Sequence, residues 1–426
     1  MANADFSREQ NQTPGGFDSG SYREAKRPDT EAVRLTPLQQ KLAGLEKALD
    51  AVLSGTGENS SLVCAVTAQG TLRTGETARL LQADSGALGV QLTISRPVQR
   101  AVEAVAASTM TSGCILVLDT ATAAVRASVS VPCYDPEHLA DSLQAENSPF
   151  LNRALQSYAV GSVFKPVLAA TALEAGLQPV FECTGAVVVD GQIFRCAGGV
   201  PHGQVDLAAA LEKSCNGYFI RLGQQLGAES LLDAAKAFGF GQSLLLAEGF
   251  AAEAGQLPTP QELAQSGQLA NFSFGQGSLL ATPMQVAALF NTLAADGVYR
   301  APYVLQATLD EATGQPVETL SHPRGRRVIS AQNAALLRAM LVQVVQQGTA
   351  QDAAGLSGGA GGKTGTAQTG QFTPEGTERC NLWFAGFWPA EKPRYTIVVL
   401  QDGAVHTAYS GAAIFAQVCT ALEAAG

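Results

Sequence analysis

One short segment, Gly161-Ser-Val-Phe-Lys-Pro166, fixes where a helix begins and which polar side chains that helix presents. Proline has no N–H and is tolerated only in the first turn of a helix, so Pro166 predicts a helix that begins little earlier than Ser162. A serine and a lysine three residues apart lie on one helix face, a turn from each other. The segment therefore predicts that Ser162 and Lys165 are neighbours at the positive end of a helix dipole.

Such a pair can act as a nucleophile and its base once the lysine has lost its proton. A free lysine has a pKa of about 10.4, about three units too high for a base at neutral pH. The helix dipole lowers the pKa by less than about one unit, so burial or a second cation must supply the rest. Ser-x-x-Lys alone occurs by chance in most proteins of this length, so its meaning depends on partner motifs elsewhere.

The first partner motif is Ser214-Cys-Asn216, which lies between two predicted helices. A second hydroxyl at Ser214 can relay a proton. The amide of Asn216 can hold Lys165 or a substrate amide. The motif is therefore a candidate proton path for the Ser162 and Lys165 pair.

The second partner motif, Lys363-Thr-Gly-Thr366, lies on a strand-like run. Lys363 offers the second cation, and Thr364 can donate to a substrate carboxylate. Gly365 lets a peptide backbone lie close along the strand. Thr366 can supply one oxyanion donor through its backbone N–H, and the backbone N–H of Ser162 is the other expected donor.

Ser-x-x-Lys, Ser-x-Asn and Lys-Thr-Gly in this order form the motif set of penicillin-binding proteins and class A β-lactamases. On these motifs the chain resembles a class B penicillin-binding protein, a D,D-transpeptidase of peptidoglycan synthesis. The resemblance covers the chain from about Leu45 to the C-terminus and is specific from about Gly113. It includes further segments of the family: His202-Gly203, Phe274–Gly277, Thr282–Gln285 and Trp383–Phe387.

The resemblance implies an α+β fold, a serine β-lactamase-like transpeptidase domain at 109–426 with a central antiparallel sheet flanked by helices. A short α+β pedestal-like segment at 34–108 and a polar, disordered lead at 1–33 are expected before it. Local signals agree, because strands at both ends of the domain with helices between them favour such a sheet. Helices are predicted at 35–59, 97–107, 206–213, 216–227, 282–297, 330–347 and 411–421, and strands at 62–66, 90–94, 114–118, 125–131, 363–368, 381–388 and 394–401.

The resemblance also implies a reaction. Ser162 attacks the carbonyl of a terminal D-Ala-D-Ala peptide, and Lys165 takes its proton. Ser214 and Asn216 carry the proton onward, Lys363 supports the lysine base, and the hydroxyls of Thr364 and Thr366 hold the donor carboxylate. The partners are peptidoglycan stem peptides, and β-lactams acylate the same serine as covalent inhibitors.

Other outcomes of an acyl-enzyme stay open at this point. A D,D-carboxypeptidase differs only in using water rather than an amine to resolve the intermediate. A β-lactamase of class A would need a Glu-x-x-Leu-Asn-type segment, and Glu262-Leu-Ala-Gln265 lacks the asparagine. A non-catalytic β-lactam sensor would keep the motifs but would normally be fused to a signalling segment.

Charge and hydropathy limit the partners and the location. The net charge of −10 argues against a nucleic-acid partner. No signal peptide is recognised, and no apolar run reaches the roughly 18 residues of a membrane span, so a soluble or trimmed form is expected. By resemblance, the protein acts at the extracytoplasmic face of the bacterial cell membrane, beside a polytopic membrane glycan polymerase. No cofactor is expected.

Two of the eight cysteines stand apart from the rest. Cys183 and Cys196 flank two short strand-like runs around Asp190-Gly191, a hairpin that could bring the sulfurs together as a possible disulfide. Whether that bond forms depends on the redox compartment. Cys215 is expected to be a buried apolar side chain. His138, His202, His322 and His406 show no metal-binding spacing with the cysteines, so no metal site is predicted.

Overall fold

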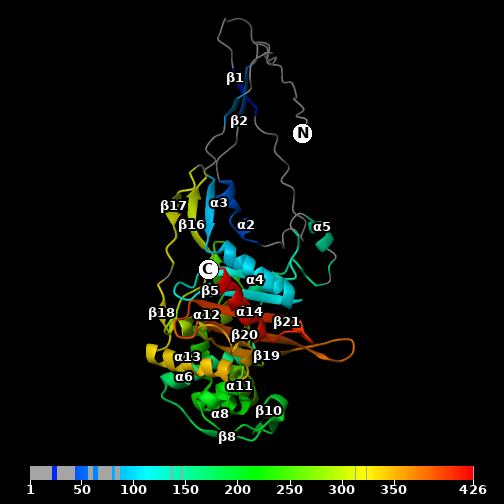
Figure 1. Ribbon diagram of the computed structural model, residues 1–426, viewed down its shortest axis with the longest axis vertical. Coiled ribbons are helices and arrows are strands. Elements are labelled where there is room, and N and C mark those ends of the chain that lie inside the picture. The colour runs from blue at the N-terminus through cyan, green and yellow to red at the C-terminus, as the bar shows by residue number, and fades with distance from the viewer. Residues whose placement is uncertain are drawn as a thin grey trace. The chain divides into compact units, whose positions relative to one another are not determined.

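The computed structural model in Figure 1 describes residues 22–25, 44–55, 61–65, 79–81, 87–135, 138–143, 145, 147–311, 313–322 and 324–425. Its contacts divide the chain into two compact units. One unit comprises Met1–Gln91 with Ala307–Thr319, and the other comprises Leu92–Gln306 with Leu320–Gly426.

The first unit contains short helices and two small antiparallel sheets. Its helices are α2 (Leu45–Ala48) and α3 (Asp50–Ser54). One sheet has the order β1-β2-β3 and the other β17-β16-β4. The strands are β1 (Tyr22–Ala25), β2 (Ser61–Ala65), β3 (Arg79–Leu81), β4 (Leu88–Leu92), β16 (Leu305–Asp310) and β17 (Pro316–Thr319).

This unit differs from the sequence prediction in two respects. Strand β1 falls inside the lead expected to be disordered, because its backbone pairs with β2; the rest of 1–33 and residues 34–43 lie outside the described residues. The division between the units lies at Gln91 and Leu92 rather than at 108 and 109, and Ala307–Thr319 joins the first unit.

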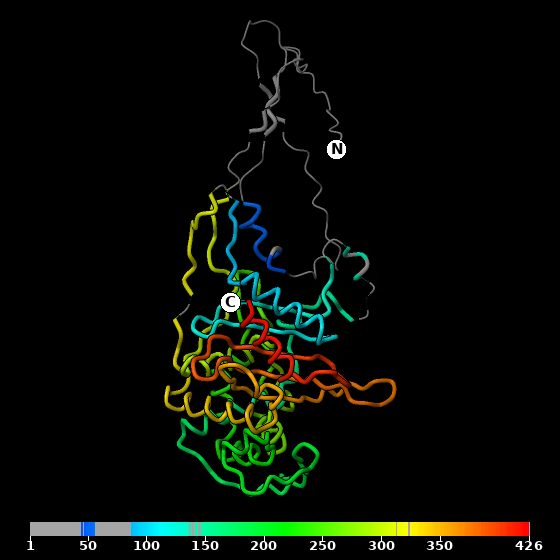
Figure 2. Tube along the Cα trace, in the orientation of Figure 1, coloured from blue at the N-terminus to red at the C-terminus, as the bar shows by residue number. Residues whose placement is uncertain are grey.

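A five-stranded antiparallel sheet of order β19-β20-β21-β5-β6 forms the centre of the second unit. The strands β5 (Gly113–Asp119) and β6 (Val125–Val131) come early in the chain and β21 (Tyr395–Ala404) comes late, yet β5 pairs directly with β21. Figure 2 shows these cyan and red segments side by side. Residues 114–118 and 397–400 are fully buried, as expected for central strands of a covered sheet. The predicted α+β fold with a central antiparallel sheet is confirmed.

Helices cover the sheet, as predicted (Figure 1). The helices α4 (Arg96–Thr109) and α14 (Gly411–Ala424) pack on each other and on the sheet. The helix α12 (Pro283–Ala294) contacts β5, β20 and β21 and is buried along its whole length. Its start has the capping box predicted from Thr282 and Gln285, with both hydrogen bonds present. The helix α13 (Ala331–Gln346) contacts α12 and the edge strand β19 (Gly361–Phe372).

A helical part of the second unit carries the remaining motifs. The helices α7 (Leu207–Glu212) and α8 (Asn216–Leu226) lie on either side of Ser214 and Cys215. The predicted hairpin is present as β9 (Ala186–Val189) and β10 (Gln192–Arg195). The central-sheet strand β20 spans Glu378–Trp388. The remaining elements of the second unit are α5 (Leu139–Ser142), β7 (Tyr158–Ala159), β8 (Phe181–Cys183), β11 (Gly203–Val205), α9 (Ala228–Ala237), β12 (Leu244–Ala247), β13 (Phe250–Ala252), α10 (Pro260–Leu263), α11 (Ser266–Ser273), β14 (Leu280–Ala281), β15 (Val298–Tyr299) and β18 (Arg326–Arg327).

Within the described part of the chain, every helix is too short or too polar to cross a lipid bilayer.

Candidate active site

Ser162 lies in a single 3₁₀ turn, η2 (Gly161–Phe164), that leads directly into α6 (Lys165–Glu174). The predicted helix start is therefore correct to within a turn, and Pro166 occupies the first turn of α6. Gly161 has a φ of 64°, and its backbone N–H donates to the carbonyl of Gly275 at 2.8 Å. A Cβ on Gly275 would lie 2.0 Å from the carbonyl oxygen of Gly161, so this contact needs glycine. Ser162 is left half-exposed on an otherwise buried turn.

Lys165 is fully buried, and its ammonium group points to the Ser214–Asn216 loop. Its Nζ donates to the Ser214 carbonyl at 2.7 Å, to the Ser214 hydroxyl at 3.1 Å and to Asn216 Oδ1 at 2.8 Å. Among the described residues, no carboxylate forms an ion pair with Lys165. Three of the residues predicted to act together, Lys165, Ser214 and Asn216, are thus joined by hydrogen bonds, and Ser162 lies one turn ahead of the lysine.

Burial lowers the pKa of Lys165 from its ordinary value to about 7, against an opposing effect of the thiols of Cys215 and Cys196. This is the size of shift that a lysine needs to act as a base at neutral pH. Burial is the main cause of the lowering at Lys165, and support from the charge of Lys363 stays a prediction. The pKa of Lys363 is itself well below its ordinary value, first because of burial and then because of the charge of Lys165.

The Ser214–Asn216 loop is held in a strained shape between α7 and α8. Ser214 has a φ of 53°, a conformation that costs a non-glycine residue about 1–3 kcal/mol and persists only where neighbours fix it. The Cys215 N–H donates to the Ala210 carbonyl at 2.9 Å, and the Asn216 amide donates to the Arg195 carbonyl of β10 at 2.9 Å. Asn216 therefore connects Lys165 with the β9–β10 hairpin.

The edge strand β19 passes beside the Ser162 turn. A Cβ on Gly365 would lie 3.0 Å from Val163 Cγ1, and one on Gly161 would lie 2.8 Å from the carbonyl oxygen of Thr366. Gly365 thus allows a close approach of the Ser162 turn, while the approach of a substrate peptide at this residue stays a prediction. An edge strand leaves alternate N–H and C=O groups without a partner strand, so a peptide can add along it.

From Lys363 on, the side chains of β19 alternate between buried and more exposed positions on the two faces of the sheet. Lys363 is fully buried, and its Nζ donates to the neighbouring Thr364 carbonyl at 3.2 Å. Thr364 is half-buried and Thr366 is exposed. The Thr364 hydroxyl lies 2.6 Å from that of Thr349, just beyond α13. Sequence reasoning missed Thr349, since no local motif marks it.

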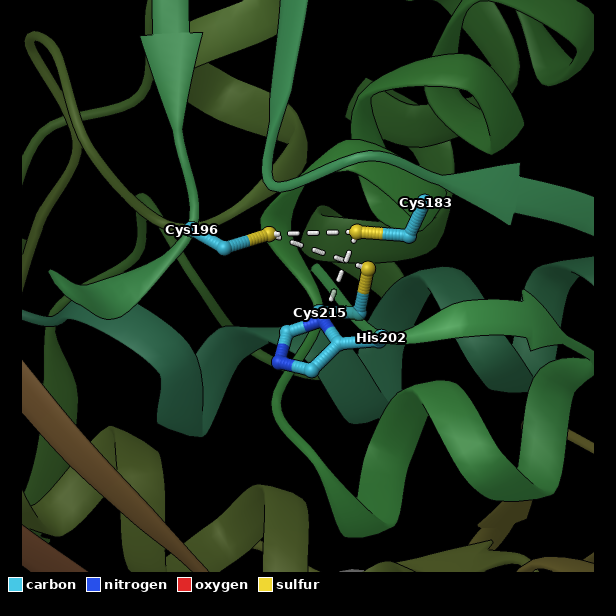
Figure 3. A group of neighbouring side chains, drawn as sticks. All are labelled: Cys183, Cys196, His202 and Cys215. Carbon is cyan, nitrogen blue, oxygen red and sulfur yellow. Dashed lines mark hydrogen bonds between the residues drawn. The ribbon is translucent and has the colours of Figure 1, made fainter. Parts of the chain in front are cut away.

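Sequence reasoning also missed a cluster behind the Ser214–Asn216 loop (Figure 3). The sulfurs of Cys183 and Cys196 lie 3.7 Å apart, close as the hairpin predicted but beyond the roughly 2.05 Å of a disulfide bond, and both are free thiols. Cys215 and His202 join them, and the four potential ligand atoms all lie within 4.8 Å of one another. The sequence predicts no metal site here, because the histidines and cysteines lack short-range metal-binding spacing.

The fold and the site together define a class of protein: a helix-flanked sheet domain in which a serine, a buried lysine and a Ser-x-Asn loop meet beside an edge strand. Residues 113–420 match the family model described as the penicillin-binding protein transpeptidase domain. The chain belongs to this family, and the resemblance drawn from its three motifs is confirmed.

Individual relatives agree with this assignment. The chain is 32% identical over 415 residues to the peptidoglycan D,D-transpeptidase PbpA of Mycolicibacterium smegmatis, over 90% of this chain and 79% of that one. It is similar to the D,D-transpeptidase domain of a peptidoglycan glycosyltransferase from Eggerthella lenta, with a TM-score of 0.75, 25% identity and coverage of 95% and 96%. A ceftriaxone acyl-enzyme complex of penicillin-binding protein A from Mycobacterium tuberculosis has a TM-score of 0.71, 27% identity and 80% coverage of each chain.

Proposed function

We propose that this protein is a peptidoglycan D,D-transpeptidase that cross-links stem peptides through an acyl-enzyme on Ser162. The observation that carries the proposal is the buried Lys165, one turn after Ser162 and hydrogen-bonded to Ser214 and Asn216. The names of the relatives, which are D,D-transpeptidases and penicillin-binding proteins, support the same activity.

Acylation begins with the neutral amine of Lys165, which takes the proton of the Ser162 hydroxyl as its oxygen attacks the carbonyl carbon of the penultimate D-Ala. The C–N bond to the terminal D-Ala then breaks. The departing amine takes a proton through Ser214, whose hydroxyl lies 3.1 Å from Lys165 Nζ. Asn216 fixes the lysine by accepting from it at 2.8 Å.

The edge strand positions the donor peptide. The backbone N–H groups of Ser162 and Thr366 stabilise the oxyanion, since Thr366 lies directly against the Ser162 turn. The hydroxyls of Thr364 and Thr366 bind the terminal carboxylate, with Lys363 buried beneath them. An amine of a second stem peptide then attacks the ester carbonyl and loses a proton. The ester bond to Ser162 breaks, and the serine oxygen regains a proton, which restores the hydroxyl.

Inhibitors, location and partners follow from this activity. A β-lactam acylates Ser162 and stays, because its leaving group remains tethered and blocks the acceptor. The reaction takes place at the extracytoplasmic face of the cell membrane, where peptidoglycan is assembled, with a polytopic membrane glycan polymerase as the partner. We assign the pedestal-like segment at 34–108 to the end of a non-catalytic pedestal, which precedes the transpeptidase domain in the chain.

The alternative outcome is a D,D-carboxypeptidase, in which water resolves the same acyl-enzyme. Incubation with a D-Ala-D-Ala pentapeptide, with and without an acceptor amine, separates the two. We expect released D-Ala together with a peptide dimer when the acceptor is present. D-Ala release that yields only the shortened peptide would favour the carboxypeptidase, and absence of any release or β-lactam adduct would refute the proposal.

The pH dependence of acylation tests the base. Because the pKa of Lys165 is about 7, the lysine is protonated and inactive below that pH and neutral above it. The rate of β-lactam labelling should therefore rise as pH increases through about 7 and fall about tenfold for each unit below it. Single-turnover labelling across this range measures the effect, and a flat profile would contradict a base with this pKa.

A further inference from the structure

The cluster of Cys183, Cys196, His202 and Cys215 comes from three separate segments that meet behind the Ser214–Asn216 loop (Figure 3). Cys196 Sγ lies 3.7 Å from Cys183 Sγ and 3.8 Å from Cys215 Sγ. His202 Nδ1 lies 3.4 Å from Cys183 Sγ. All three cysteines are buried, and His202 is half-buried.

These spacings match a tetrahedron around a zinc-sized ion. With Zn–S bonds of about 2.3 Å and Zn–N bonds of about 2.0–2.1 Å, tetrahedral geometry places sulfurs about 3.8 Å apart and a sulfur and a nitrogen about 3.6 Å apart. The three measured contacts lie within about 0.2 Å of these values. Three cysteines and one histidine also form a ligand set typical of closed, structural zinc sites.

The backbone holds each ligand in place without help from an ion. The N–H of Cys196 donates to the Gly185 carbonyl at 3.0 Å, and the N–H of His202 donates to the Cys183 carbonyl at 3.1 Å. Cys215 is fixed at the start of α8, where its Sγ accepts from the Tyr218 N–H at 3.4 Å. A site arranged in this way binds a metal with little reorganisation.

We propose that Cys183, Cys196, His202 and Cys215 form a structural metal centre for a zinc-like divalent cation. Cys215 stands between Ser214 and Asn216, so the bound ion ties this loop to the β9–β10 hairpin and to the segment of His202. The strained φ of Ser214 needs such support, because a conformation of this kind persists only where the surroundings fix it. The centre therefore positions Ser214 and Asn216 against Lys165; this consequence, unlike the metal binding itself, rests on the proposed function.

The competing state is a Cys183–Cys196 disulfide, which would remove two of the four ligands. The sulfurs would have to approach from 3.7 Å to about 2.05 Å. Cys215 would then be left beside the disulfide as a lone thiol. The two states are exclusive, so a measurement of metal and thiols in the same sample separates them.

The test uses the full chain, exposed to zinc in the presence of a phosphine reductant and then freed of unbound metal by gel filtration. Elemental analysis should give about one zinc per chain. Cys196→Ser should lower the zinc content at least about tenfold. Cys419→Ser, a matched control at another buried cysteine on α14, should keep it.

A second readout uses the wild-type chain and therefore does not require any variant to fold. Cobalt(II) bound to the wild-type chain should give the intense visible bands and sulfur-to-metal charge transfer of tetrahedral thiolate coordination. A wild-type chain without zinc, equal zinc in Cys196→Ser and wild type, a cobalt spectrum without thiolate bands, or a Cys183–Cys196 disulfide in the reduced sample would each overturn the proposal.

Removal of the metal tests the link to the active site. A chelator should slow β-lactam labelling at Ser162 at least about tenfold, and zinc should restore it. Labelling that is unchanged after zinc loss would overturn the positioning role while leaving the metal centre. Stoichiometric zinc without any labelling at Ser162 would instead count against the proposed function alone.

Discussion

Replacement of Ser162 by alanine is expected to abolish covalent β-lactam labelling, by at least about a thousandfold. The substitution removes the oxygen that forms the ester in the proposed reaction, while the turn that carries it is fixed by backbone contacts of Gly161. The fold should therefore persist. Intact-protein mass spectrometry after incubation with a penicillin measures the adduct, and peptide mapping places the wild-type adduct on Ser162.

Ser157→Ala is the matched control for this variant. Ser157 lies five residues earlier in the same segment, and its backbone N–H, not its hydroxyl, donates to Glu253 at 2.9 Å. This variant should be labelled like the wild type. An adduct that persists in Ser162→Ala, or one mapped to another residue in the wild type, would refute Ser162 as the nucleophile.

Local sequence signals predicted most of the second unit because its elements begin and end at residues with clear chemistry. Thr282 and Gln285 form the capping box that begins α12, and Pro166 sets the start of α6. Asp190 and Gly191, with φ values of 49° and 80°, make the turn of the β9–β10 hairpin. The three motifs of the site were recognisable because each is contiguous in the chain.

What the sequence did not predict depends on contacts between distant segments. The cluster of Cys183, Cys196, His202 and Cys215 has no short-range spacing, and it forms only where the β9–β10 hairpin and the β8–β11 pair pack near the start of α8. The extent of burial of Lys165 is likewise a property of the packed interior. The sequence could state how large a pKa shift was needed and that burial or a second cation must supply it, but not how far the fold would bury Lys165.

The first unit was harder to predict for the same reason. One of its sheets joins β4 with β16 and β17, strands that lie far away in the sequence. Residues 307–319 carry no motif that marks them as an addition to an earlier segment. The predicted boundary at 108 and 109 lies just before Gly113, where the family resemblance becomes specific, whereas the contacts assign α4 to the larger unit.

Replacement of Lys165 by methionine is expected to slow acylation of Ser162 by about 10²–10⁴-fold, the usual contribution of a general base. Methionine keeps an unbranched side chain in the buried site and removes the amine. It leaves the Ser214 carbonyl and Asn216 Oδ1 without their donor, at a cost of about 1–3 kcal/mol each. Because it also removes the need to bury an amine, the variant should still fold, which thermal unfolding can check.

The variants of Lys165 separate a base from a positioning group. Lys165→Arg keeps a donor for Ser214 and Asn216 but cannot lose its proton, because the pKa of arginine is above about 12. If Lys165 is the base, both variants should be slow and should lose the rise in rate through about pH 7 that the wild type shows. Lys213→Met, at an exposed lysine next to Ser214, should keep both the rate and the pH profile. Recovery of wild-type labelling in Lys165→Arg would mean that Lys165 only holds the loop in place, and the base would then have to be sought elsewhere in the site.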